Sequence, residues 1–207
     1  MVKTVIFDFD GTLADTWKAI LNIVKDNQEE WGLPDINEEL INDFRGKGFF
    51  ELFKKYNIIL LKLPFIFPKA KKELGKKIDK VPLFPGMREV LMTLRKKGIK
   101  LGILTTNSEE NVKKFLRHHN LEIFDFIGSE ISLMGKDKAL KKVLEKRNIN
   151  KNETMYIGDE IRDIEACKEN GLKIISVTWG FNKKEILKKN NPDYLIDKPE
   201  EILKIVS

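Results

Sequence analysis

The stretch VKTVIFDFDGTLADT occupies residues 2–16 of a chain of 207 residues. Its residues 5–7 (VIF) form a β-branched and aromatic apolar run, which is typical of a strand buried on both faces of a sheet. Because side chains two apart in a strand point to the same side, Asp8 and Asp10 are expected to leave the strand end together. Two acids at the end of a buried strand are costly unless a cation or a proton compensates their charge. This stretch therefore predicts a charged site directly behind a buried strand.

A tight turn is expected after the two acids. Gly11 permits a sharp bend of the backbone, and Thr12 and Asp15 carry short polar groups that can bond loop amides. A satisfied turn of this kind explains one buried acid but does not explain both.

Strands and helices alternate in the second part of the chain. Apolar runs typical of strands recur at residues 99–104, 123–127, 154–157, 173–177 and 194–196. Helical patterns separate them at residues 87–97, 108–118, 137–147, 161–170 and 183–190. Alternation of this kind indicates right-handed crossovers and a mostly parallel sheet. We therefore predict an α/β fold with a Rossmann-like, mostly parallel sheet.

The region between the first strand and this alternating part shows helical patterns only. They cover residues 16–31, 36–44, 49–56 and about 66–79. The predicted organisation is a discontinuous α/β core domain, residues 1–15 and 84–207, interrupted by an all-helical cap domain at residues 16–83.

Composition favours a cytoplasmic protein without a membrane partner. The single cysteine, Cys167, excludes an internal disulfide and suits the core of an amphipathic helix. The longest apolar stretch, residues 58–67, is interrupted by Lys62 and Pro64 and is too short to span a bilayer. No leader-like segment stands before the first strand, so we expect a cytoplasmic monomer or homodimer.

The basic charge of the chain is concentrated in one segment. The net charge is +6, and residues 54–80 alone hold nine lysines and two acids. Such a segment can form a surface for a polyanion such as nucleic acid, or the solvated face of an ordinary helical domain. We favour the second interpretation, so a nucleic-acid partner is not expected.

Polar residues follow other predicted strands at the edge where parallel sheets bind ligands. Thr105, Thr106, Asn107 and Ser108 come after the strand 99–104 and open a helix. They can serve as a helix N-cap, for which Asn107 or Ser108 is suited, or as a seat for a phosphate group.

Lys136 stands at the start of another predicted helix. A lysine is unfavourable there, because the N-terminal end of the helix dipole is already positive. An anion or a group of acids facing the helix would compensate, although a solvated lysine is the simpler alternative.

The stretch YIGDEIRD, residues 156–163, ends a further strand. Asp159 lies at the strand end, and Asp163 lies four residues later, so both can face one site once the helix begins. Acids at a helix N-terminus also favour the dipole without any further role.

These segments together resemble the four motifs of the haloacid dehalogenase-like hydrolases. The pentapeptide DFDGT at residues 8–12 resembles motif one, and Thr106, with Thr105 as the competing choice, resembles motif two. Lys136 matches motif three better than Lys138 does. Asp159 and Asp163 match the acids of motif four. Their order and the position of the insertion are similar to members with a C1 cap, and residues 177–180 (VTWG) extend the similarity to phosphoglycolate phosphatase-like hydrolases.

The resemblance implies a magnesium site. Asp8 and Asp159 would be side-chain ligands of Mg²⁺, Asp10 would contribute its backbone carbonyl, and Asp163 would brace the ligands. Oxygen ligands suit Mg²⁺, and the sequence has no cysteine and histidine cluster to suggest zinc.

The resemblance also implies the roles of the catalytic side chains. Asp8 would be the nucleophile and Asp10 the general acid and base, while Thr106, Asn107 and Lys136 would hold the transferring phosphoryl group. We therefore expect a Mg²⁺-dependent phosphatase that hydrolyses a small, phosphoglycolate-like phosphomonoester through an aspartyl-phosphate. The alternatives are a phosphomutase of the same fold and a polyanion-binding protein that uses the basic segment.

Substrate choice is expected to depend on the inserted helices. The stretch FRGKGF at residues 44–49 interrupts two helices with a pair of glycines and places two cations between aromatic residues. Arg45 and Lys47 would favour a substrate with a second anionic group. A plain turn with solvated charges is the other interpretation.

Overall fold

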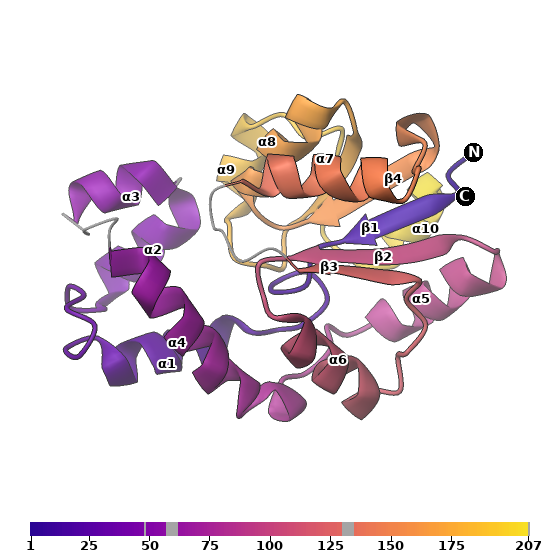
Figure 1. Ribbon diagram of the computed structural model, residues 1–207. Helices are drawn as coiled ribbons and strands as arrows, with labels where there is room; N and C mark the ends of the chain where they lie inside the picture. Colours follow the sequence, from indigo (N-terminus) through magenta and orange to yellow (C-terminus); the bar gives the residue numbers. More distant parts are fainter. Residues whose placement is uncertain (48, 57–61, 130–134, 207) are drawn as a thin grey trace.

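A parallel sheet of six strands forms the centre of the protein (Figure 1). The computed structural model describes residues 1–47, 49–56, 62–129 and 135–206. The strands stand in the order β3-β2-β1-β4-β5-β6. Their bounds are β1 (Thr4–Phe7), β2 (Lys100–Thr105), β3 (Phe126–Ser129), β4 (Thr154–Gly158), β5 (Lys173–Val177) and β6 (Tyr194–Ile196). All neighbouring pairs are parallel, which confirms the predicted α/β sheet.

The strand β1 lies in the middle of the sheet and is buried along its whole length. Phe7 at its end is in register with Ile103 of β2 and Ile157 of β4. Val5 and Phe7 belong to the apolar cluster on one face of the sheet, whereas Ile6 belongs to the cluster on the other. A strand that packs on both faces reads as a continuous apolar run, which is why this segment was recognisable.

Helices cover both faces of the sheet. One apolar cluster includes residues of α5, α6 and α10, and the other includes residues of α7, α8 and α9. Their bounds are α5 (Met87–Lys96), α6 (Glu109–His118), α7 (Lys136–Lys146), α8 (Ile161–Asn170), α9 (Lys184–Lys189) and α10 (Glu201–Val206). Of these, α10 was not predicted. Cys167 is buried in α8, as its apolar surroundings predicted.

The position of β3 differs from the prediction. We expected a strand at residues 123–127, but β3 begins only at Phe126. The carboxylate of Asp125 accepts a hydrogen bond from the backbone N–H of Leu101 (2.8 Å) and pairs with Arg95. The side chain of Asp125 therefore takes the place of a strand carbonyl as the acceptor for Leu101, and regular pairing of β3 with β2 starts at Phe126.

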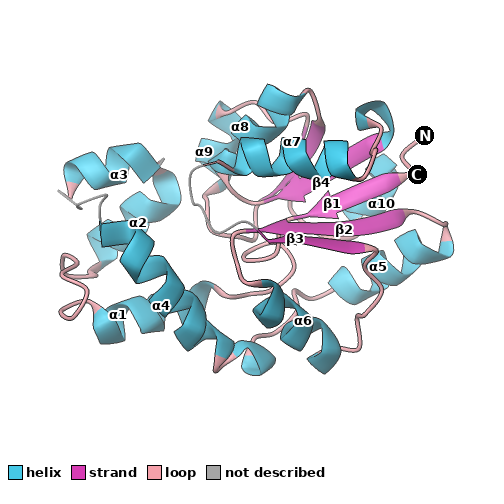
Figure 2. Cartoon of the chain, in the orientation of Figure 1, coloured by secondary structure: helices cyan, strands magenta, loops and turns pink. Residues whose placement is uncertain are grey.

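The described part of the sequence between β1 and α5 forms four α-helices and a short 3₁₀ turn, η2 (Ile78–Lys80). They are α1 (Trp17–Asn27), α2 (Glu38–Gly46), α3 (Phe49–Lys55) and α4 (Leu63–Gly75). They lie together beyond the carboxyl ends of the strands, and the described part of this region contains no strand (Figure 2). The division into domains at residues 16–83 stays a prediction. Within the described ranges, no helix is long and apolar enough to cross a membrane.

Candidate active site

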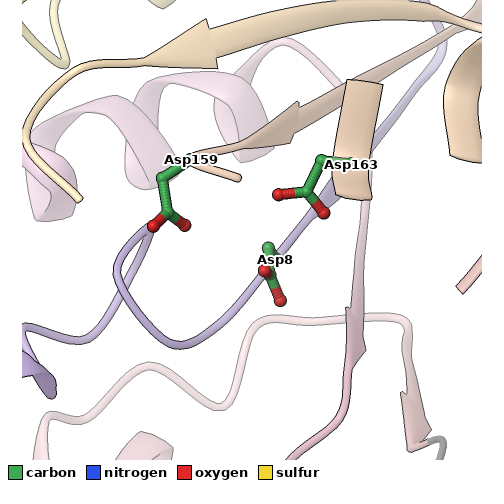
Figure 3. Close-up of side chains that lie close together, drawn as sticks. All are labelled: Asp8, Asp159 and Asp163. Carbon is green, nitrogen blue, oxygen red and sulfur yellow. The ribbon is translucent and has the colours of Figure 1, made fainter. Parts of the chain in front are cut away.

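Three acids meet at the carboxyl ends of β1 and β4. Asp8 follows β1, Asp159 follows β4, and Asp163 lies in the first turn of α8 (Figure 3). All three are buried, and one oxygen of each lies within 4.8 Å of the others. Because β1 and β4 are adjacent in the sheet, Asp8 and Asp159 share one site although they are 151 positions apart in the chain.

The start of α8 fixes the orientation of Asp163. Asp163 and Glu160 form a capping box, in which the backbone N–H of Glu160 donates to Asp163 Oδ2 at 3.0 Å. The hydroxyl of Tyr156 donates to Asp163 Oδ1 at 3.3 Å. Asp163 therefore stabilises the N-terminus of α8 through the helix dipole and is also a member of the site.

Asp159 is held by two donors from different loops. The hydroxyl of Thr12 donates to Oδ1 at 2.6 Å, and the backbone N–H of Phe181 donates to Oδ2 at 2.7 Å. The sequence suggested that Thr12 can bond loop amides; in the structure its hydroxyl faces a carboxylate that β4 brings beside the turn. Phe181 was not predicted; it lies directly after the VTWG stretch at residues 177–180.

Lys136 forms the positive centre of the site. Its ammonium is buried, contacts Asp8 Oδ2 at 2.7 Å and also pairs with Asp163. Burial by itself would lower the pKa of Lys136, but the charges of Asp163 and Asp8 outweigh burial and hold this pKa above its usual range. The two carboxylates thus compensate for the unfavourable position of a lysine at the start of α7.

Burial makes the charges of the acids costly. It raises the pKa of Asp8 to about 7 against the opposing charge of Lys136, and it raises the pKa of Asp159 well above its usual value, with neighbouring acids adding to the effect. A buried group of carboxylate oxygens with this surplus of negative charge fits a divalent cation such as Mg²⁺, which prefers oxygen ligands.

The side chain of Asp10 lies outside this group of three acids. Both of its oxygens accept hydrogen bonds from Asn107 Nδ2, at 3.2 and 3.1 Å. Loss of hydration raises the pKa of Asp10 to about 6, although Thr16 and Asn107 oppose the shift. The two acids of one turn therefore have different hydrogen-bond partners, while burial raises the pKa of both.

The turn after β2 distinguishes its two threonines. The hydroxyl of Thr105 is buried and accepts from the backbone N–H of Asn107 at 2.9 Å, whereas Thr106 lines the cavity described below. Asn107 is fixed further by Asn111, whose Nδ2 donates to it at 2.9 Å, and by Ser129, whose hydroxyl donates to its carbonyl at 2.7 Å. Ser108 caps α6 by accepting from Asn111 N at 3.2 Å. One turn thus combines the helix cap with a hydroxyl-bearing residue, Thr106, at the cavity.

A cavity of about 250 Å³ lies between these strand ends and the helices α1–α4. Its polar walls come mainly from the site: Asp8, Asp10, Thr106, Asn107, Glu160 and Arg162. Glu160 and Arg162 form an ion pair and were not identified as site residues from the sequence. Their positions inside the stretch 159–163, between two predicted site acids, could have indicated them.

The structure does not bring Arg45 and Lys47 to this cavity. Arg45 donates from Nε to the carbonyl of Phe181 (3.1 Å) and from Nη2 to that of Gly180 (3.2 Å). Lys47 pairs with Asp43 at 3.0 Å. Gly48, in the same segment, lies outside the described residues.

Comparison with known proteins agrees with this arrangement. The family model described as haloacid dehalogenase-like hydrolase matches residues 5–177. A phosphoglycolate phosphatase of Synechococcus elongatus is 30% identical over 207 residues, which are 100% of this chain and 98% of that protein. The pyrophosphatase PpaX of Bacillus mycoides is 26% identical and is matched over 97% of its length by 100% of this chain.

The fold is also found among solved structures. The crystal structure of a predicted phosphatase from Clostridium acetobutylicum has a TM-score of 0.85 at 24% identity, with 100% of this chain and 99% of that chain covered. The sequence relatives and the family match, which spans most of the chain, show that this protein belongs to the haloacid dehalogenase-like hydrolases.

Proposed function

We propose that this protein is a Mg²⁺-dependent phosphatase that hydrolyses a small phosphomonoester through an aspartyl-phosphate on Asp8. The observation that carries the proposal is the pairing of Asp8 with Lys136 at the end of β1, beside Asp159 and Asp163 and open to the cavity. The relatives named phosphoglycolate phosphatase and pyrophosphatase support the reaction class.

In the first step, an oxygen of Asp8 attacks the phosphorus atom as the bond from phosphorus to the alcohol oxygen breaks. Asp10 is placed to give a proton to the departing alkoxide, and its raised pKa of about 6 gives it a larger protonated fraction near neutral pH than an ordinary aspartate has. In the second step, Asp10 takes a proton from water, which attacks the aspartyl-phosphate and releases inorganic phosphate. Asn107 holds the carboxylate of Asp10 for both steps.

The remaining residues would position the phosphoryl group. Lys136 supplies positive charge beside Asp8, and Thr106 offers a hydroxyl at the cavity wall. Asp8 and Asp159 would hold Mg²⁺ with the backbone carbonyl of Asp10, and Asp163 would orient both Lys136 and the ligands. When bound, Mg²⁺ would withdraw charge from the phosphoryl oxygens and keep the neighbouring carboxylates ionised.

The proposal is tested with p-nitrophenyl phosphate as a general aryl ester. The purified protein should release phosphate in Mg²⁺ and stop in EDTA. Asp8→Asn should lower kcat by about 10³-fold or more, because an amide is a poor nucleophile. Asp26→Asn, on an exposed part of α1, removes one carboxylate away from the site and should leave kcat unchanged.

Other outcomes separate the alternatives. Undiminished turnover in EDTA would reject the metal assignment, and near-normal turnover of Asp8→Asn would reject the covalent intermediate. A phosphomutase would move phosphate between positions of a sugar with little release, and a binding protein would show neither reaction.

A further inference from the structure

The walls of the cavity opposite the strand ends are apolar. Each of the four helices α1–α4 contributes to them, for example Val24 from α1, Phe44 from α2, Leu52 from α3, and Ile66 and Ala70 from α4. On the other side lie the carboxylates and the turn after β2. The space therefore joins a charged end, where a phosphoryl group would be bound, to an apolar end.

A second anionic group would find little compensation in this space. Among the described residues that line it, the cations are Lys71 and Arg162. Arg162 is paired with Glu160, and Lys71 likewise is not without a partner. Arg45 and Lys47, which the sequence suggested for this purpose, do not line the cavity. A carboxylate placed among the apolar walls would lose its hydration without gaining an equivalent partner.

From this distribution we propose that the substrate is a phosphomonoester whose alcohol carries an apolar alkyl or aryl group, which packs against α1–α4 while the phosphate meets Asp8. The inference rests on the proposed phosphatase function and names its substrate class. It differs from a short carboxylated ester such as phosphoglycolate, the substrate in the name of one relative.

The direct test is a series of primary alkyl phosphates, from methyl through butyl to hexyl phosphate, with 2-phosphoglycolate beside them. Primary alcohols are similar leaving groups, so the chemical step stays nearly constant along the series. Each methylene that enters the apolar space should raise kcat/KM about three- to fourfold, which gives roughly 30- to 60-fold between methyl and butyl phosphate. The kcat/KM for hexyl phosphate should be higher than the kcat/KM for 2-phosphoglycolate.

A substitution on α4 tests whether the alkyl group binds in the cavity. Ala70→Leu enlarges a side chain of α4 that lines the space and should lower kcat/KM for hexyl phosphate by about tenfold or more, while methyl phosphate changes less than about twofold. Lys72→Leu puts the same side chain on the exposed face of α4 and should leave both values unchanged.

The results distinguish the two levels of the proposal. The apolar substrate class alone is rejected if p-nitrophenyl phosphate is still hydrolysed but kcat/KM does not rise along the alkyl series. A higher kcat/KM for phosphoglycolate than for hexyl phosphate would reject it in the same way. Absence of phosphate release from every ester overturns the phosphatase function as well. The series on the unaltered chain decides the question by itself if Ala70→Leu does not fold.

Discussion

At the scale of single residues, the close approach of two glycines to Asp159 shows how little room the site leaves. A Cβ atom at Gly180 would lie 2.2 Å from Asp159 Oδ2, and one at Gly11 would lie 2.3 Å from the same oxygen. Gly11 also has a φ of +80°, which side-chain-bearing residues rarely adopt. The glycines of the two turns thus allow Thr12 and Phe181 to reach the carboxylate.

Gly180→Ala is expected to displace Asp159, because the added methyl group meets a buried side chain that cannot move into solvent. Because we propose Asp159 as a ligand of Mg²⁺, its displacement should weaken Mg²⁺ binding about 10- to 100-fold. Titration of Mg²⁺ by calorimetry measures the change. Gly46→Ala, where a Cβ atom meets nothing within 4 Å, is the matched control and should bind Mg²⁺ normally. Equal affinities of the two variants would contradict the assignment of Asp159 as a ligand.

The sequence identified the acids and the lysine of the site but not their partners. Asp8, Asp159 and Lys136 were recognisable because charged residues directly after buried strands, or at the wrong end of a helix, conflict with local physics. Asp163 was recognisable from its spacing of four residues after Asp159 and from the resemblance to motif four. The partner of Thr12 depends on how β4 lies beside β1, which is a long-range property. The pairing of Glu160 with Arg162 depends on side-chain orientation in one turn, which residue spacing does not determine.

At the scale of elements, the contact between α2 and the loop after β5 links the helical insertion to the site. Arg45 in the last turn of α2 donates to the carbonyls of Gly180 and Phe181, and the N–H of Phe181 donates to Asp159. The guanidinium also lies over the ring of Trp17, with its carbon 5.5 Å from the ring centroid. A helix of the insertion therefore supports the loop that orients a site carboxylate.

Arg45→Met keeps most of the side-chain stem but removes both hydrogen bonds. Hydrogen bonds from charged donors contribute about 1.5–3 kcal/mol each, so residues 180–182 should open more readily, with amide exchange at least about tenfold faster. Hydrogen exchange followed by mass spectrometry measures this. Lys47→Met removes a neighbouring cation that pairs with Asp43 and should leave exchange of the loop unchanged. The same exchange rate in both variants would show that Arg45 does not support the loop.

Strands and helices were predictable where the hydrophobic pattern of the segment itself determines its secondary structure. The strands β4 and β5 and the helix α8 follow from apolar runs and periodicity within a few residues. The start of β3 depends on the side chain of Asp125, and the cavity depends on how four amphipathic helices meet. A helical pattern indicates that one face is buried, but it does not indicate whether that face packs on protein or lines a space.

At the scale of the whole molecule, the buried charge of the site affects stability. When all three acids are ionised, Asp8, Asp159 and Asp163 together with Lys136 carry two net negative charges, which one divalent cation would balance. A cation that binds only the folded state stabilises that state by about 2.7 kcal/mol when its concentration is a hundred times its Kd. Mg²⁺ should therefore raise Tm by roughly 5–10 °C over EDTA.

Thermal melts followed by circular dichroism provide the measurement. Sodium chloride at the same ionic strength serves as the control for general salt effects, and Asp159→Asn should reduce the shift. A melting temperature that is the same in Mg²⁺ and EDTA would contradict a divalent cation site among the three acids.

The central place of β1 also has a consequence for synthesis on the ribosome. Thr4 pairs with Thr154, 150 residues later in the chain. At a translation rate of about 5–20 residues per second, β1 waits roughly 8–30 s for this neighbour. During that time a strand that is buried along its whole length in the folded protein has one open edge, even after β2 has paired with the other. The nascent chain is therefore most prone to aggregate before β4 emerges, because β1 depends for its protection on residues made 150 positions later.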